Sequence, residues 1–167
     1  GTYLSSMVAG IDFAQCIIAA GSQPVKLPAF PWQDPRVMDS TDALMLADVP
    51  KRLLVVGGGI IGLEMACVYS ALGSAVTVVE FMDQLMPGAD PDLVKPLQAL
   101  LKNRGVAIHT ACKVMQVSAG KKALTAEFEG KSVPEGRDYD RVLVSVGRSP
   151  NGGKLKAENA GVQVSER

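Results

Sequence analysis

The clearest pattern of apolar and polar positions lies near the middle of the chain. A continuous apolar run from Leu53 to Val56 leads directly into a glycine-rich turn, Gly57 to Gly62. Helix-forming residues continue from Leu63 to Leu72, and Gly73 is placed to end the helix. A second apolar run, Ala75 to Val79, follows. A strand, a glycine turn, a helix and a second strand in this order predict a parallel βαβ unit.

Upstream of this unit the pattern predicts less regular structure. The apolar run inside residues 11–22 stops at Gly21, so we expect a short buried strand closed by a turn. Prolines interrupt residues 24–50 at several points. We expect a connector there, with one brief helix capped near Ser40 or Thr41.

Downstream, a helix is predicted from Asp90 to Asn103, with Pro96 inside it. Further strands are predicted at residues 106–110, 113–118 and 123–129, and a last one from Val142 to Val146. Together these elements predict an α/β domain of the doubly wound, Rossmann-like type, with a parallel central sheet and an antiparallel β-meander.

Composition narrows the classes of partner. The 167 residues carry 17 Lys and Arg against 17 Asp and Glu, without a basic stripe, which argues against nucleic acid as a partner. No apolar stretch approaches the ~20 residues of a membrane helix, and residues 1–10 lack a secretory signal pattern, so we expect a cytoplasmic protein. The three cysteines form no close pair and no metal-ligand spacing is present, so no metal site is expected.

The glycine turn is the strongest candidate site. Gly57, Gly59 and Gly62 satisfy the G-x-G-x-x-G pattern between a strand and a helix. In this setting the first glycine permits the tight turn, the second lets the backbone approach a pyrophosphate, and the third lets the helix pack closely. The positive end of the helix dipole then faces the phosphates. The alternative is a glycine-rich turn that binds no ligand.

Glu80 ends the second strand of the unit, 18 residues after Gly62. An acid at this place is expected to accept hydrogen bonds from the adenosine ribose hydroxyls. A carboxylate would repel a 2′-phosphate, and no arginine follows it closely, so NAD is favoured over NADP as the cofactor. The alternative is a solvated charge at the end of a strand.

Two other polar residues are less specific. Glu64 could be an acceptor pointed at the nicotinamide, or only a charge stabilised in the first turn of the helix. His109, the single histidine, has no partner nearby in the sequence and is interpreted as structural.

Four strings together resemble one family, the flavin-dependent pyridine nucleotide-disulfide oxidoreductases, and within it the dihydrolipoamide dehydrogenase branch. The strings are Arg52 to Met65, Gly73 to Glu80, Ile17 to Ser22 and Val142 to Asn151. The resemblance implies an NAD-binding domain inserted into an FAD-binding domain. The parent enzyme would be a homodimer that works within a 2-oxo-acid dehydrogenase complex and passes electrons from dihydrolipoamide through a disulfide and FAD to NAD⁺.

The resemblance also implies the residues that bind NAD. Val114 matches a residue beside the adenine, Gly147 one near the nicotinamide, and Ile60 a position where some relatives carry a tyrosine. The expected cofactor-binding residues are Gly57, Gly58, Gly59, Ile60, Ile61, Gly62, Glu64, Glu80, Val114 and Gly147.

The family's paired redox cysteines and its second glycine motif have no counterpart in these residues, so we expect no catalytic residue here and no turnover by this chain alone. The expected organisation is a remnant of the FAD domain at residues 1–28, the NAD domain at 29–150 and a return segment at 151–167. The rest of its own flavoprotein chain is then its first partner. Two alternatives stay open: another flavoprotein of this group, such as an NADH oxidase or a different disulfide reductase, and a freestanding NAD-binding module.

Overall fold

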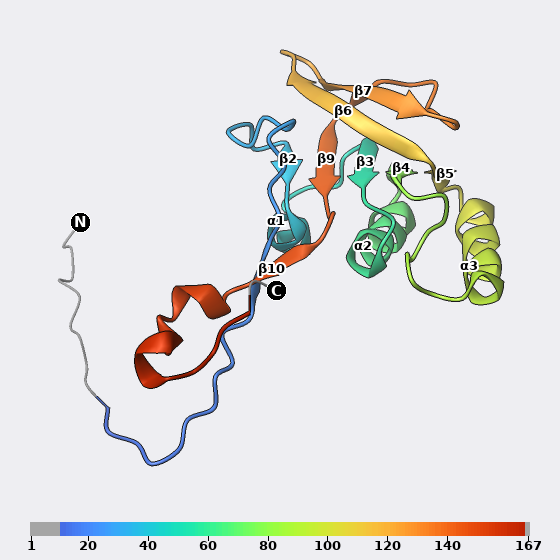
Figure 1. Cartoon of the computed structure of the whole chain (residues 1–167). Helices are drawn as coiled ribbons and strands as arrows, with labels where there is room; N and C mark the ends of the chain where they lie inside the picture. The colour runs from blue at the N-terminus through green and yellow to red at the C-terminus, as the bar shows by residue number, and fades with distance from the viewer. Residues whose placement is uncertain (1–10, 166–167) are drawn as a thin grey trace. The chain divides into compact units, whose positions relative to one another are not determined.

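The computed structural model describes residues 11–165, which form two compact units. The larger unit comprises residues 23–149 (Figure 1). The smaller unit is formed by the described residues before 23 and after 149 and contains two short 3-10 helices, Gly152–Lys154 and Ala157–Ala160. The segment expected to lack a secretory signal, residues 1–10, lies outside the described residues.

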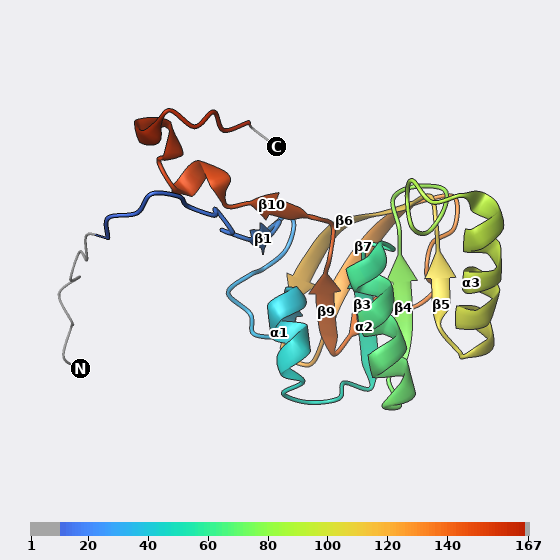
Figure 2. The ribbon, with the colours of Figure 1, turned by 90° about the horizontal axis from the view of Figure 1, so that it is seen from below.

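The larger unit is built on a five-stranded sheet whose neighbouring strands are all parallel (Figure 2). In spatial order the strands are β2 (Val37–Met38), β9 (Arg141–Val144), β3 (Arg52–Val56), β4 (Ala75–Val79) and β5 (Ala107–His109). The chain enters this sheet at β2 and moves outward from β3 to β5. It then returns to insert β9 between β2 and β3. The carboxyl ends of β3, β4 and β9 therefore lie at one edge of the sheet.

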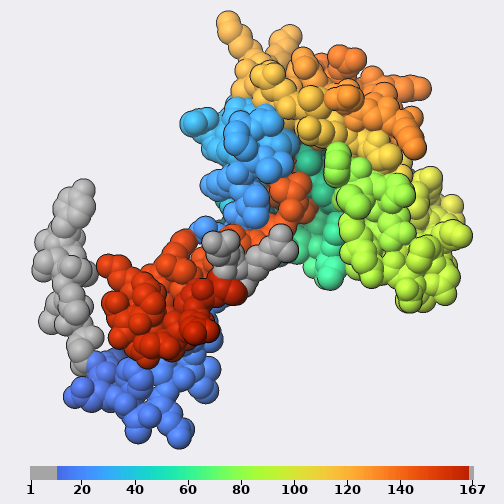
Figure 3. Space-filling view, in the orientation of Figure 1, coloured from blue at the N-terminus to red at the C-terminus, as the bar shows by residue number. Residues whose placement is uncertain are grey.

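Different layers cover the two faces of this sheet. The helices α1 (Ser40–Met45), α2 (Ile60–Ala71) and α3 (Pro91–Asn103) lie on one face, as Figures 1 and 2 show. An antiparallel sheet of β6 (Cys112–Ala119), β7 (Leu124–Gly130) and β8 (Asp138–Tyr139) lies on the other. It appears in yellow and orange in the space-filling view (Figure 3). The predicted α/β class, with a parallel sheet and an antiparallel meander, is confirmed.

The layers explain why β3 is a continuous apolar run. Successive side chains of a strand point to opposite faces, and here both faces are covered. Leu53 and Val55 pack in the core beneath the helices, whereas Leu54 and Val56 pack in the core beneath the antiparallel sheet.

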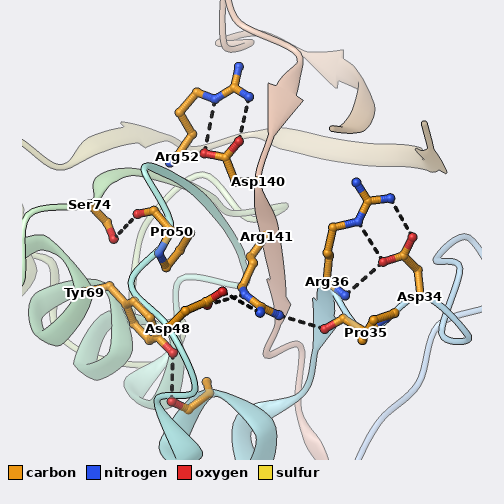
Figure 4. Close-up of polar contacts among 11 residues, drawn as sticks. Asp34, Pro35, Arg36, Asp48, Pro50, Arg52, Tyr69, Ser74, Asp140 and Arg141 are labelled. Atoms are coloured by element: carbon orange, nitrogen blue, oxygen red, sulfur yellow. Dashed lines mark hydrogen bonds and ion pairs between the residues drawn. The ribbon is translucent and has the colours of Figure 1, made fainter. Parts of the chain in front are cut away.

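Ion pairs and hydrogen bonds hold the amino-terminal end of the parallel sheet together (Figure 4). Arg141 of β9 pairs with Asp48 through two hydrogen bonds of 2.5 and 2.8 Å and also donates to the Pro35 carbonyl. Arg52 of β3 donates to Asp140 at 2.8 Å. These contacts tie the start of β9 to the connectors on either side of it.

Several expected boundaries were wrong. The brief helix exists, but its cap is Asp39, whose side chain accepts the N–H groups of Thr41 and Asp42. The last strand of the parallel sheet ends at Val144 rather than Val146, because the chain bends at Val146 before the glycine at 147. The two-residue strands β2 and β8 were not predicted.

The buried strand expected within residues 11–22 was also wrong. The described residues before 20 form no strand, and Ile17 is 94% exposed. An apolar run becomes a buried strand only where a neighbouring strand pairs with it, and no described segment does so. The pairing begins later, between β1 (Ser22–Pro24) and β10 (Arg148–Pro150).

Candidate functional site

The glycine turn connects the end of β3 to the start of α2. Gly57 has a φ of +108°, and a Cβ there would collide with the carbonyl oxygen of Ser145. At Gly62 a Cβ would meet the Gly57 carbonyl oxygen and lie 2.7 Å from the Ser145 hydroxyl oxygen. Both positions therefore require glycine, because backbone occupies the space that a side chain would fill.

Gly59 is a glycine of a different kind. It is the N-cap of α2, and a Cβ built on it meets nothing within 4 Å. No side chain caps the helix at this end. Open space therefore lies beside uncapped N–H groups and the positive end of the helix dipole, an arrangement that suits a phosphate group.

Ser145 belongs to this turn and was missed by sequence reasoning. Its N–H donates to the Val56 carbonyl at 2.8 Å, and its hydroxyl donates to the same carbonyl at 3.1 Å. It thereby holds the end of β9 against the glycine turn. The signal that could have revealed it is a small polar residue at the end of an otherwise apolar run, directly before Val146 and Gly147.

Glu80 is a buried carboxylate at the end of β4, with only 7% of the residue exposed. Its Oε2 accepts the N–H of Gly58 at 2.7 Å, and its Oε1 accepts the N–H of Met82 at 2.8 Å. The alternative of a solvated strand-end charge is therefore wrong. Each carboxylate oxygen can accept a second hydrogen bond, so two acceptor positions are left after these contacts.

A cavity of about 770 Å³ opens beside the turn and Glu80. Its walls are mainly apolar, a common property of sites that bind organic cofactors. Of the residues expected to bind the cofactor, those that line it are Gly57, Gly59, Ile60, Ile61, Glu80, Val114 and Gly147. Gly58 and Gly62 are buried behind this wall, where they shape the turn.

Glu64 stands apart from these residues. Because α2 begins at Ile60, Glu64 lies in the second turn of the helix, so the interpretation as a first-turn charge was wrong. Its side chain is exposed and does not line the cavity.

Two titratable residues near the site have structural environments. Cys112 lines the cavity, and burial raises the pKa of its thiol and favours the neutral form. Burial likewise lowers the pKa of His109, whose Nδ1 lies 3.1 Å from the Ser132 hydroxyl. His109 does not line the cavity. Among the described residues, no group of His, Cys, Asp or Glu side chains could hold a metal ion.

The geometry suits an extended ligand with negative charge near Gly59 and hydroxyl donors near Glu80. A dinucleotide has both, since its pyrophosphate and its adenosine ribose are adjacent groups. The described residues thus fit the expected cofactor at the glycine turn and at Glu80.

The structure has no helix, within its described residues, that is long and apolar enough to cross a membrane.

Known proteins resemble this chain in sequence and in fold. The model of the protein family "Pyridine nucleotide-disulphide oxidoreductase" matches residues 5–167. A curated dihydrolipoyl dehydrogenase from Vibrio cholerae is 51% identical over 159 residues, which is 94% of this chain and 33% of that protein. The chain thus spans about a third of the length of this relative.

Solved structures of a disulfide reductase and of two related oxidases share the fold. The flavoprotein disulfide reductase RclA from Escherichia coli has a TM-score of 0.76 at 32% identity, covering 88% of this chain and 33% of its own. A water-forming NADH oxidase from Lactobacillus brevis, bound to NADH, has a TM-score of 0.71 at 26% identity, covering 83% and 31%. An engineered NADPH-bound mutant of that oxidase has a TM-score of 0.71 at 25% identity, over the same shares.

Proposed function

The chain belongs to the pyridine nucleotide-disulphide oxidoreductase family, and from this premise we propose that it is the NAD-binding domain of a dihydrolipoyl dehydrogenase. The parent enzyme would oxidise dihydrolipoamide through a disulfide and FAD and reduce NAD⁺. The observation that carries the proposal is the buried Glu80 carboxylate, hydrogen-bonded to the glycine turn and open to the cavity.

The phosphate end of the cofactor would lie against the amino terminus of α2. The open space over Gly59 admits a pyrophosphate, whose charge the helix dipole and the N–H groups of Ile60 and Ile61 stabilise. Gly57 and Gly62 keep this turn close to the sheet. The chain's own contribution to catalysis is then position and electrostatics, while bound NAD and FAD supply the redox chemistry.

The ribose end would lie at Glu80, and this contact favours NAD over NADP. The two free acceptor positions of the carboxylate match the 2′ and 3′ hydroxyls of the adenosine ribose. A 2′-phosphate would bring a second negative charge to a buried one, which is strongly unfavourable.

The engineered oxidase supports this preference. The NADPH-bound protein is the NADH oxidase with five substitutions. They replace a glycine by alanine, an aspartate by alanine, an alanine by arginine, a methionine by serine and a proline by arginine. The glycine and the aspartate are 18 positions apart, and the other three follow the aspartate by one, two and seven positions. In this chain the same intervals join Gly62 to Glu80, Phe81, Met82 and Pro87. This chain thus has an acid at the position where the oxidase lost one.

The remaining site residues would hold the two ends of NAD. Val114 of β6 lines the cavity and would contact the adenine, while Gly147, which follows β9, lines it too and would lie near the nicotinamide. The contact of Glu64 with the nicotinamide stays a prediction, which requires the ring to extend beyond the cavity wall.

The smaller unit supports the proposal that the rest of a flavoprotein chain is the first partner. Ile11, Phe13, Ile17 and Ile18 are each more than half exposed there. So many uncovered apolar side chains in one segment are typical of an interface.

We assign residues 29–150 to the NAD domain, and the compact unit of residues 23–149 supports this boundary. The homodimer and the 2-oxo-acid dehydrogenase complex are part of the proposal for the parent. The free state of the three cysteines supports a cytoplasmic location.

Calorimetric titration of the purified chain with NADH and NADPH tests the proposed function. We expect saturable binding of NADH, with NADPH weaker by about tenfold or more, because one repelled charge costs at least about 1.4 kcal/mol. Mixing the chain with dihydrolipoamide and NAD⁺ should give no NADH. Tighter binding of NADPH would contradict the choice of cofactor, and sustained NADH production would contradict the division of roles between this domain and the rest of the enzyme.

A further inference from the structure

Phe81 follows Glu80 and combines a firmly held backbone with an uncovered ring. On one side, the Glu80 N–H donates to the His109 carbonyl at 2.8 Å, and the Glu80 carbonyl accepts the Cys112 N–H at 3.0 Å. On the other side, the Met82 carbonyl accepts the Ala111 N–H at 2.7 Å, and the Met82 N–H donates to the Glu80 side chain. These four hydrogen bonds limit the movement of the Phe81 backbone, yet 68% of the residue is exposed.

The position of this ring is specific to the cavity. Phe81 lines the cavity at the end of β4, and Val114 lines it from β6. The two ring contacts found in the described part of the larger unit join Phe30 to Trp32 and Phe128 to Tyr139, so Phe81 takes part in neither. An aromatic ring held at a cavity wall without an aromatic neighbour presents a free face to a flat ligand.

The covalent structure of a dinucleotide brings its base to this place. A base is attached to C1′ of the ribose, the carbon next to the one that bears the 2′ hydroxyl. If Glu80 holds the ribose hydroxyls, the base must lie within a few ångströms of the residues beside Glu80, as the short bonds of a sugar allow no greater reach. Phe81 is the aromatic residue at that position.

We infer that Phe81 is the stacking platform for the adenine and thus a determinant of affinity for the adenosine half of the cofactor. This inference rests on the proposed function. Stacking of a base on an aromatic side chain is stabilising for any base, so Phe81 contributes affinity while Glu80 contributes the choice between NAD and NADP.

Met82 provides a matched control. It is the next residue, is 47% exposed, and does not line the cavity. Its N–H, which holds Glu80, is a backbone group and is retained in a Met82→Ala variant. Both substitutions change exposed apolar side chains of one loop, but only Phe81→Ala removes a ring from the cavity.

Calorimetric titration of the whole chain with NADH and with ADP-ribose tests the inference. Phe81→Ala should weaken binding of both ligands by the same factor, about five- to a hundredfold, whereas Phe81→Tyr and Met82→Ala should bind as the unchanged chain does. The thermal unfolding midpoint should be the same in all variants, because the ring is exposed.

The outcomes separate the inference from the proposed function. Unchanged affinity of Phe81→Ala, or equal weakening by Met82→Ala, would overturn the stacking role while leaving the NAD site in place. Weaker binding of NADH by Phe81→Ala, with unchanged binding of ADP-ribose, would overturn the proposal that Phe81 contacts the adenine. Failure of the unchanged chain to bind either ligand would overturn the proposed function and this inference with it.

Discussion

The side chain of Glu80 accepts the backbone N–H of Gly58 in a buried hydrogen bond of 2.7 Å. The bond joins the acid after β4 to the glycine turn after β3. The expected ribose site and the expected phosphate site are therefore directly connected. Glu80 therefore has a structural role in addition to its proposed contact with the ribose. A substitution there must affect both folding and binding.

Glu80→Ala should lower the free energy of unfolding by about 2 to 4 kcal/mol, because two backbone N–H groups lose their acceptor. It should also weaken NADH binding by about 1 to 3 kcal/mol through the lost ribose hydrogen bonds. Urea unfolding and calorimetric titration measure the two effects. Glu127→Ala, at an exposed position of β7, is the control and should change neither. Full stability of Glu80→Ala would show that the bond to Gly58 contributes little.

Gly57→Ala should destabilise the fold by about 1 to 3 kcal/mol, since a Cβ at this positive φ would be strained and would meet the Ser145 carbonyl. Gly136→Ala is the matched control, because a Cβ there meets nothing within 4 Å. Thermal unfolding compares the two variants. Equal midpoints would contradict the close approach of β9 to the turn.

Acid should weaken the larger unit through its ion pairs. Hydrogen bonds from Arg36 lower the pKa of Asp34 from 3.8 to about 2, and Arg141 and Arg52 lower the pKa values of Asp48 and Asp140 in the same way. The stabilisation from Asp34 is complete above about pH 4 and is lost as the pH falls toward about 2. Asp34→Asn should therefore lose less stability than the unchanged chain across this range in urea unfolding. Identical pH profiles would exclude a contribution from Asp34.

Two substitutions together should reverse the preference for NADH over NADPH. Glu80→Ala with Phe81→Arg removes the repelling carboxylate and adds a guanidinium that can pair with a 2′-phosphate. An arginine can also stack on the adenine, so the base should keep a platform. The double variant should bind NADPH more tightly than NADH by about tenfold in the same titration. A continued preference for NADH would contradict the placement of the ribose at Glu80.

The sequence was most informative where local signals were sufficient. The run from β3 through α2 to β4 was predicted correctly, because apolar runs and glycines determine it without reference to distant residues. The strand expected in residues 11–22 was wrong because its burial depends on a pairing partner. The strands β2 and β8 have two residues each and are recognisable only by their register with neighbouring strands.

The candidate site shows the same division. The glycines and Glu80 could be found from their spacing, since that spacing reflects the length of one strand and one helix. The role of Ser145 could not, because it depends on β9 inserting beside β3, 88 residues after the turn it supports. The same limit applies to Met82, whose N–H reaches Glu80 only after the loop has folded back.

We propose above all that NAD binds in the cavity between the glycine turn, Glu80 and β9. Amide chemical shifts of the isotope-labelled chain during titration with NADH test it most directly, because they locate the ligand. We expect the largest shifts at Gly59, Ile60, Phe81 and Gly147, which line the main cavity. Ser70 and Arg104, which line a second, smaller cavity beside α2, should show none. Shifts that are absent from the glycine turn, or that centre on the second cavity, would contradict it.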